Sequence, residues 1–277
     1  MTGARNVVAR RTVLGVLVVG AVITAFPFLL VLMNSVKSPE DYTTKGPLGL
    51  PSGIYLKGIT DFWVRVDFGE KLVNSTVISG SVAVLAVVVS ILMAYALGIG
   101  RVKGRTWIIA IFLLANLMPQ EALIYPLYYL AKEVDLYDTK LAVIIIFTAI
   151  QSAFGVYLLS SVLSTFPREI IEAARIDGAN RWQVLWRVVV PLSWPTLSVL
   201  LVFFFIWTWN EFFIPMIMLV SNDNQTVPVA IGVLQGQRLM DVTAQSASAL
   251  LGIVPAVVFF LIFQRTLTRG IAVGAVK

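Results

Sequence analysis

The sequence EAARIDGANRWQVLWRVVVPLSWP, residues 172–195, forms a polar island between long apolar runs. It contains two acids, three arginines and an Asp-Gly break. Buried polar groups are costly unless they are paired, so a hydrophobic chain that keeps this segment presents it to water. We therefore expect the island to contact a partner there.

The composition around the island is that of a membrane protein. Of 277 residues, 58% are hydrophobic and 13% are charged, whereas a soluble domain carries about 25% charged residues. We therefore expect an all-α integral membrane protein with a single domain, residues 1–277. The net charge of +6 is spread over the ends of the apolar runs, which argues against nucleic-acid binding. The absence of Cys and His excludes disulfides, thiol catalysis and a His-ligated metal.

Six apolar runs are long enough to cross a bilayer, since a spanning helix needs ~20 mostly apolar residues. The first run is free of charge for 25 residues, too long for the core of a signal peptide, so we expect it to be retained. The fold class is therefore six transmembrane helices with both termini on one side. The expected spans are residues 12–36, 72–100, 106–131, 141–163, 196–220 and 243–264, with the island in a loop over 164–195.

The distribution of Lys and Arg predicts the orientation. Thirteen of the 21 basic residues lie at the two termini, in the loop near residue 103 and in the loop 164–195 that holds the island, and the other eight lie in the longer loops of the opposite side. The first set is expected to be cytoplasmic, which places both termini and the island inside the cell. The outer loop 37–71 is rich in Pro, Gly and aromatics, so we expect short helices on the membrane surface. The outer segment 221–244 either folds back on the bundle or inserts into an external partner.

The pattern of the island predicts helix, turn, helix. Pro167 suits the start of a helix, and Gly178 suits the residue after the last turn because it accepts a positive φ. Asn180 and Gln183 have the spacing of a capping box, so a second helix is expected to begin there and to end before Pro191. The alternative to a docking element is an amphipathic helix at the lipid headgroups, anchored by Trp182, Trp186 and Trp194.

The motif EAARIDGA, followed by VVVP, closely resembles the EAA loop of binding-protein-dependent ABC importer permeases. Three further stretches resemble the carbohydrate branch of that family, the maltose-type inner-membrane permeases: MPQEALIYPLYYLAKEVDLYDT (118–139), FIWTWNEFFIPMIML (205–219) and QRTLTRGIAVGAVK (264–277). The resemblance spans nearly the whole chain. It implies the type I ABC importer permease fold and the transport of a sugar, in particular an oligosaccharide, across the cytoplasmic membrane.

The resemblance also implies how the island works. Its first helix resembles the coupling helix that sits in a cleft of a cytoplasmic ATP-binding subunit. Glu172 would pair with a basic residue in that cleft, and Gly178 would permit the sharp turn. The residues that the motif assigns to ATPase coupling are Glu172, Ala173, Ala174, Arg175, Asp177, Gly178 and Ala179.

The chain itself is not expected to be an enzyme or to bind a cofactor, because it contains no phosphate-binding loop of the form GxxxxGK[ST]. ATP and Mg are expected on the partner subunit. The implied partners are a dimer of ATP-binding subunits, a second homologous permease subunit, an extracytoplasmic solute-binding protein and the lipid bilayer.

Two acids lie deep in apolar runs, where a charge is costly and therefore indicates function. Glu121 lies 14 residues past Trp107, and Glu211 lies 15 past Thr196, a rise of ~21 Å along each helix. We expect both acids at a similar height, beyond the midplane. Alternatively, they lie at the outer interface or pair structurally within the bundle. The candidate substrate pathway joins these two acids with Gln120, Asn210 and Trp209.

Other functions stay open from the residues alone. The same transporter class can carry a polyol or glycerol phosphate, although no Lys or Arg lies deep in an apolar run to bind phosphate. A secondary transporter would need no ATPase. A membrane enzyme would need an acid–base pair, and the only candidates are the two glutamates of the substrate pathway.

Overall fold

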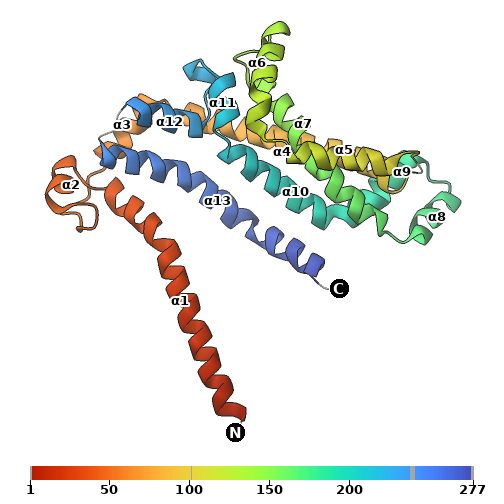
Figure 1. The fold of residues 1–277 in the computed structure, drawn as a ribbon, viewed down its shortest axis with the longest axis horizontal. Helices are drawn as coiled ribbons and strands as arrows, with labels where there is room; N and C mark the ends of the chain where they lie inside the picture. Colours follow the sequence, from red (N-terminus) through yellow and green to blue (C-terminus); the bar gives the residue numbers. More distant parts are fainter. Residues whose placement is uncertain (1, 101, 238–240, 276–277) are drawn as a thin grey trace. The chain divides into compact units, whose positions relative to one another are not determined.

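The computed structural model describes residues 2–100, 102–237 and 241–275 (Figure 1). These residues form helices and loops and contain no β-strand, as the sequence predicts. The chain divides into two compact units, Met1–Phe68 with Ile231–Pro255 and Gly69–Ala230 with Ala256–Lys277. The units reflect contacts along the chain, and the expectation of a single domain stays a prediction. In a bilayer, lipid replaces water around each helix, so apolar helices are not forced into a single core.

The first unit contains α1 (Thr2–Ser35), α2 (Pro39–Lys45) and α3 (Lys57–Arg65). Residues 10–35 of α1 are apolar enough to span a membrane, and none of their most apolar window is buried within the described chain. The two short helices after α1 confirm that the loop 37–71 contains short helices.

Hydrogen bonds hold the loop after α1 in place. Asp41 accepts from the backbone N–H and the hydroxyl of Ser52, each at 2.7 Å, and pairs with Lys45 at 3.0 Å. The hydrogen bonds from Ser52 and Lys45 lower the pKa of Asp41 to about 2. Lys37 is buried, and its Nζ donates to Asn34 Oδ1 at 2.9 Å and to the Gly46 carbonyl at 3.0 Å.

The second unit is built on three long, apolar helices that lie side by side (Figure 1). They are α4 (Phe68–Gly98), α7 (Lys140–Ser164) and α10 (Val190–Asn210). The shorter elements of this part of the chain are α5 (Arg105–Leu117), η1 (Gln120–Leu123), α6 (Ile124–Glu133), α8 (Arg168–Ile176), α9 (Arg181–Val184), the π-helical turn η2 (Leu185–Val189), α11 (Phe213–Met218) and η3 (Asn222–Asn224). Two further helices follow, α12 (Val227–Gln237) and α13 (Val242–Ala275).

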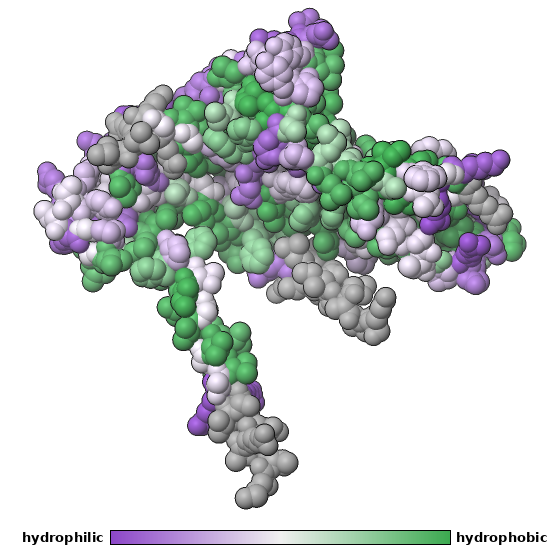
Figure 2. Space-filling view, in the orientation of Figure 1, coloured by the Kyte–Doolittle hydropathy of each residue, from purple (hydrophilic) through white to green (hydrophobic). Residues whose placement is uncertain are grey.

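Five helices in the described part of the chain are long and apolar enough to cross a membrane, or six if the bent pair α5–α6 counts as one span. Their outer surfaces are mainly hydrophobic, and hydrophilic residues gather at the end that carries α8 (Figure 2). The fifth span differs from the expected range 196–220, because helical structure begins at Arg181 and runs to Asn210.

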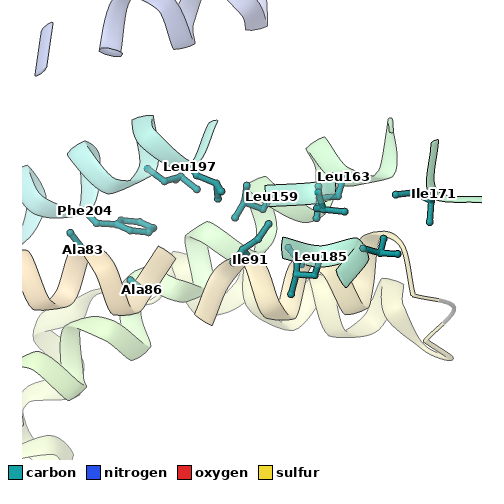
Figure 3. Packing of buried hydrophobic residues seen from close by; sticks show 13 residues of the cluster. Ala83, Ala86, Ile91, Leu159, Leu163, Ile171, Leu185, Leu197 and Phe204 are labelled. Atoms are coloured by element: carbon teal, nitrogen blue, oxygen red, sulfur yellow. The ribbon is translucent and has the colours of Figure 1, made fainter. Parts of the chain in front are cut away.

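Two clusters of buried side chains hold the second unit together. One joins α4, α7 and α10 to the island and includes Ile91, Leu159, Leu163, Ile171, Leu185, Leu197 and Phe204 (Figure 3). The other joins α4 and α7 to α6 and α11 and includes Ile78, Val82, Ile124, Phe147, Ile214 and Met218. The first cluster fixes the island, and the second fixes the region of the two candidate acids.

The segment that begins at Ser221 is tied to α4 and to the start of α7. Asn74 Nδ2 donates to the carbonyls of Asp223 at 2.7 Å and Gln225 at 3.0 Å. Asp138 accepts from the backbone N–H of Val220 at 2.9 Å and from that of Ser221 at 3.1 Å. Burial alone would raise the pKa of Asp138, but hydrogen bonds from Ser221 and Val220 lower it below the usual value. The first part of this segment therefore folds back on the bundle.

Candidate functional site

The polar island folds as two helices at one end of α4 and α7 (Figure 1). Its first helix, α8, begins one residue after Pro167, whose missing N–H costs nothing at a helix start. Ile171 is buried in the cluster that it shares with Leu163 and Leu185, so one face of α8 is anchored to the membrane helices (Figure 3). The hydroxyl of Tyr95 on α4 donates to the Arg181 carbonyl at 3.2 Å and holds the second helix.

The turn between the two helices is a Schellman motif. Gly178 has φ +84°, the left-handed conformation that favours glycine. Its N–H donates to the Arg175 carbonyl at 3.0 Å, and the Ala179 N–H donates to the Ala174 carbonyl at 3.0 Å. These are the two hydrogen bonds that define this helix ending, so the predicted role of Gly178 as the helix terminator is confirmed.

The second helix begins with the predicted capping box. Gln183 N–H donates to Asn180 Oδ1 at 2.9 Å, and Asn180 N–H donates to Gln183 Oε1 at 2.8 Å. The prediction that this helix ends before Pro191 is wrong, because α9 continues through η2 into α10. In the π-helical turn, the Val190 N–H donates to the Leu185 carbonyl, five residues earlier instead of four. The hydrogen-bond pattern has therefore already changed at the residue before Pro191, which has no N–H to donate.

The island divides its residues between core and surface. Ala174 and Ala179 pack against the buried cluster. The other residues assigned to coupling face outward: Glu172, Ala173, Arg175, Asp177 and Gly178 are exposed. Neither Glu172 nor Arg175 forms an ion pair with any residue that the structure describes. The outward face of α8 therefore presents two charged side chains that form no ion pair within the described chain.

Ile176 was not among the site residues predicted from the sequence, and it is 86% exposed at the tip of α8. A single exposed apolar residue is ordinary on a protein surface. Here it stands between Arg175 and Asp177, next to the turn, so it adds an apolar contact to a charged face. The signal in the sequence was one β-branched apolar residue between two charged residues ahead of the glycine.

The two candidate acids lie at breaks between helices, which corrects the expectation that they lie deep within continuous helices. α5 ends at Leu117, Met118 is extended, and Glu121 is exposed in η1. The helices on either side of this break are bent by 95°. Pro119 explains the break, because proline lacks an N–H and disfavours helical geometry at the residue before it.

The second break has the same cause. Glu211 follows the last residue of α10 and has an extended ψ of 128°. A continuous helix would need an N–H at residue 215 to bond to the Glu211 carbonyl, and Pro215 has none. Glu211 Oε1 instead accepts from the Phe213 N–H at 3.2 Å, which begins α11. The rise of ~21 Å along each helix therefore does not describe where the acids lie.

The structure brings the two breaks to one core cluster rather than bringing the five pathway residues together. Ile124 and Ile214, each three residues after an acid, are both buried in the cluster that joins α6 and α11. Trp209 is buried, and its ring stacks on Phe205 with centroids 5.7 Å apart. Asn210 Nδ2 donates to the Ile206 carbonyl at 2.7 Å. Gln120 is the first residue of η1.

Comparison with known proteins gives a consistent result. Residues 86–273 match the family of binding-protein-dependent transport system inner membrane components. The chain is 33% identical to the inner membrane ABC transporter permease protein YcjP of Escherichia coli K12, over 92% of both chains. It is 29% identical to the melibiose/raffinose/stachyose import permease protein MelC of Bacillus subtilis 168, over 91% of both. The crystal structure of a bacterial ABC transporter that imports alginate contains a similar chain, with TM-score 0.80, 21% identity and coverage of 96% and 98%.

Proposed function

Because the chain belongs to the family of binding-protein-dependent transport system inner membrane components, we propose that it is the permease subunit of an ATP-driven importer for a sugar, in particular an oligosaccharide. The sugar assignment is supported by the relative MelC, which is named for the import of melibiose, raffinose and stachyose. The family description supports a solute-binding protein as the partner that delivers the substrate.

The observation that carries the proposal is the outward face of α8. The helix is anchored through Ile171, ends in a Schellman turn at Gly178 and presents Glu172 and Arg175 without ion pairs among the described residues. We propose that this face docks in a cleft of an ATP-binding subunit, where Glu172 meets a basic residue and Ile176 an apolar one. ATP and Mg are bound by that subunit, and hydrolysis occurs there.

The rest of the assembly follows from the same proposal. A dimer of ATP-binding subunits needs two docking helices, so a second homologous permease subunit supplies the other one. The excess of Lys and Arg on the side of the island supports a cytoplasmic location of both termini. Closure of the ATP-binding subunits would then move the two docking helices together and open the pathway on the outer side.

We propose that the pathway passes the two breaks, one at Gln120 and Glu121 and the other at the end of α10, at Asn210 and Glu211. A helix break frees backbone carbonyls and amides, and together with acid and amide side chains these groups match the hydroxyls of a sugar. Trp209 is buried, so its ring would reach a sugar only after the side chains around it move. The pathway therefore changes shape when it opens.

Co-purification tests the proposal. The affinity-tagged chain, expressed with its cognate ATP-binding subunit and solubilised in detergent, is expected to bring that subunit down, and sugar uptake is expected to be sensitive to vanadate. A secondary transporter would show neither. Thermal-shift measurements of the partner solute-binding protein against mono- and oligosaccharides identify the substrate, and stabilisation by oligosaccharides is the expected result.

A further inference from the structure

A basic cavity of about 430 Å³ lies beside α8, between the loop that joins α4 to α5 and the corner that joins α7 to α8. Its described lining contains four basic residues and one acid, a net charge of +3: Lys103, Arg105, Arg168, Arg175 and Glu172. None of these five residues forms an ion pair with another described residue. The positive charge of the cavity is therefore uncompensated within the described chain.

Two helix starts add to this positive potential. α5 begins at Arg105 and α8 at Arg168, and both residues line the cavity. The residues before them, Gly104 and Pro167, make no side-chain hydrogen bond to the helix. The first N–H groups of a helix carry partial positive charge and lack partners within the helix, so they favour an anion.

The position of the cavity indicates whether its anion is a phospholipid or a soluble molecule. Ile99, Leu163 and Phe166 line it and lie at or just beyond the ends of α4 and α7, where the apolar spans end. Trp107, two residues past Arg105, is 78% exposed, as is typical of an aromatic residue at a membrane interface. A site that is basic at its centre, partly apolar in its lining and level with the ends of the spans matches a phospholipid better than a soluble anion.

We propose that this cavity binds the headgroup phosphate of an anionic phospholipid in the leaflet beside α8. Lys103 approaches the phosphate from the α4–α5 loop, Arg105 from the start of α5 and Arg168 from the start of α8. The proposal requires that α4 and α7, whose ends line the cavity, cross the membrane. Its test uses Lys103 and Arg105, which the docking proposal does not assign to the ATP-binding subunit.

The test is native mass spectrometry of the purified full-length chain with phosphatidylglycerol or phosphatidylcholine of the same acyl chains. The chain is expected to bind phosphatidylglycerol more tightly. The double variant K103Q/R105Q is expected to weaken that binding by about 25-fold, at about fivefold for each charge removed. The matched control R10Q/R11Q removes two exposed arginines elsewhere and should change binding less than twofold, as should the charge-preserving variant K103R/R105K.

Four outcomes would overturn the proposal. Equal binding of the two lipids would exclude headgroup recognition, and unchanged binding by K103Q/R105Q would exclude this cavity. Binding of inorganic phosphate alone that needs Lys103 and Arg105, without a preference for phosphatidylglycerol, would assign the cavity to a soluble phosphate. If K103Q/R105Q instead weakens capture of the ATP-binding subunit and leaves lipid binding intact, the cavity receives an acidic segment of that subunit. Should the double variant fail to fold, the single variant K103Q at an exposed position repeats the test.

Discussion

Replacing Gly178 with valine tests the turn between α8 and α9, on which the docking proposal depends. A Cβ built on Gly178 meets no atom within 4 Å outside the adjacent residues, so there is space for a side chain to begin there. The cost is conformational, because φ is +84° and an L-residue in this region is strained by about 1 to 2 kcal/mol, with a β-branched residue at about 2 to 3 kcal/mol.

That strain is as large as the interaction that holds the turn. The Schellman motif contributes two backbone hydrogen bonds, from Gly178 and Ala179, each with a net value of about 1 kcal/mol. The turn is therefore expected to open in Gly178→Val. The membrane helices should stay folded, since a domain typically has about 5 to 15 kcal/mol of stability. The exit direction of α9 changes, and the outward face of α8 loses its fixed geometry.

The assay compares uptake, ATP hydrolysis and subunit capture in the same membranes. Gly178→Val is expected to reduce sugar uptake by more than tenfold, with loss of the ATP-binding subunit on co-purification or with hydrolysis that no longer drives transport. Gly178→Asn is the matched control, because asparagine tolerates a positive φ better than other non-glycine residues, and it should retain most of the transport. Gly178→Ala should be intermediate.

Normal uptake by Gly178→Val would refute the reasoning, because a docking helix cannot keep its geometry when its terminating turn is open. An unfolded variant would show broad elution by size-exclusion chromatography and would be set aside in favour of Gly178→Ala, which carries less strain.

Three further expectations concern other parts of the chain. The pKa of Asp41 is lowered from 3.8 to about 2, so its hydrogen bonds with Ser52 stabilise the outer loop above pH 3.8 and are lost as the pH falls toward 2. Limited proteolysis of that loop should therefore increase as the pH falls over this range, and Asp41→Asn should abolish the pH dependence. In Gly155→Ala the new Cβ would lie 2.7 Å from Ser90 Cβ. This overlap should destabilise the α4–α7 contact by about 1 to 3 kcal/mol and lower the melting temperature in detergent. The exchange S90G/G155A should restore the melting temperature. Glu211→Gln should raise the KM for uptake about tenfold, as expected for losing a charged hydrogen-bond acceptor, and an unchanged KM and selectivity would remove Glu211 from the pathway.

The island was the most predictable part of the fold because its signals are local. A positive φ at Gly178 and the capping box of Asn180 and Gln183 depend on residues within one turn of each other. The apolar runs likewise identified the helices that can span a membrane. The breaks were harder to predict. Apolar residues resume soon after Gln120–Glu121 and directly after Glu211, and only Pro119 and Pro215 mark the loss of backbone hydrogen bonds.

Which side chains are buried by tertiary packing could not be predicted from the sequence. Lys37 and Lys71 were assigned to the outer loop 37–71 with short helices on the membrane surface, and both side chains are fully buried. Lys37 is satisfied by Asn34 and by a turn carbonyl nine residues away, and a contact of that kind leaves no local pattern in a sequence. The inward packing of Ala174, beside the outward Ala173, also depends on where α8 meets the core.

The most direct measurement uses the absence of cysteine from this chain, which makes single-cysteine cross-linking free of background. Cysteine placed at Ile176, which is 86% exposed on the tip of α8, is compared with cysteine at Leu50, which is 75% exposed in the outer loop. Each variant carries a photoactivatable cross-linker and is co-expressed with the cognate ATP-binding subunit. We expect a cross-link to that subunit from position 176 and none from position 50. Absence of the cross-link from 176, or equal cross-linking from both positions, would contradict the assignment of α8 as the docking element.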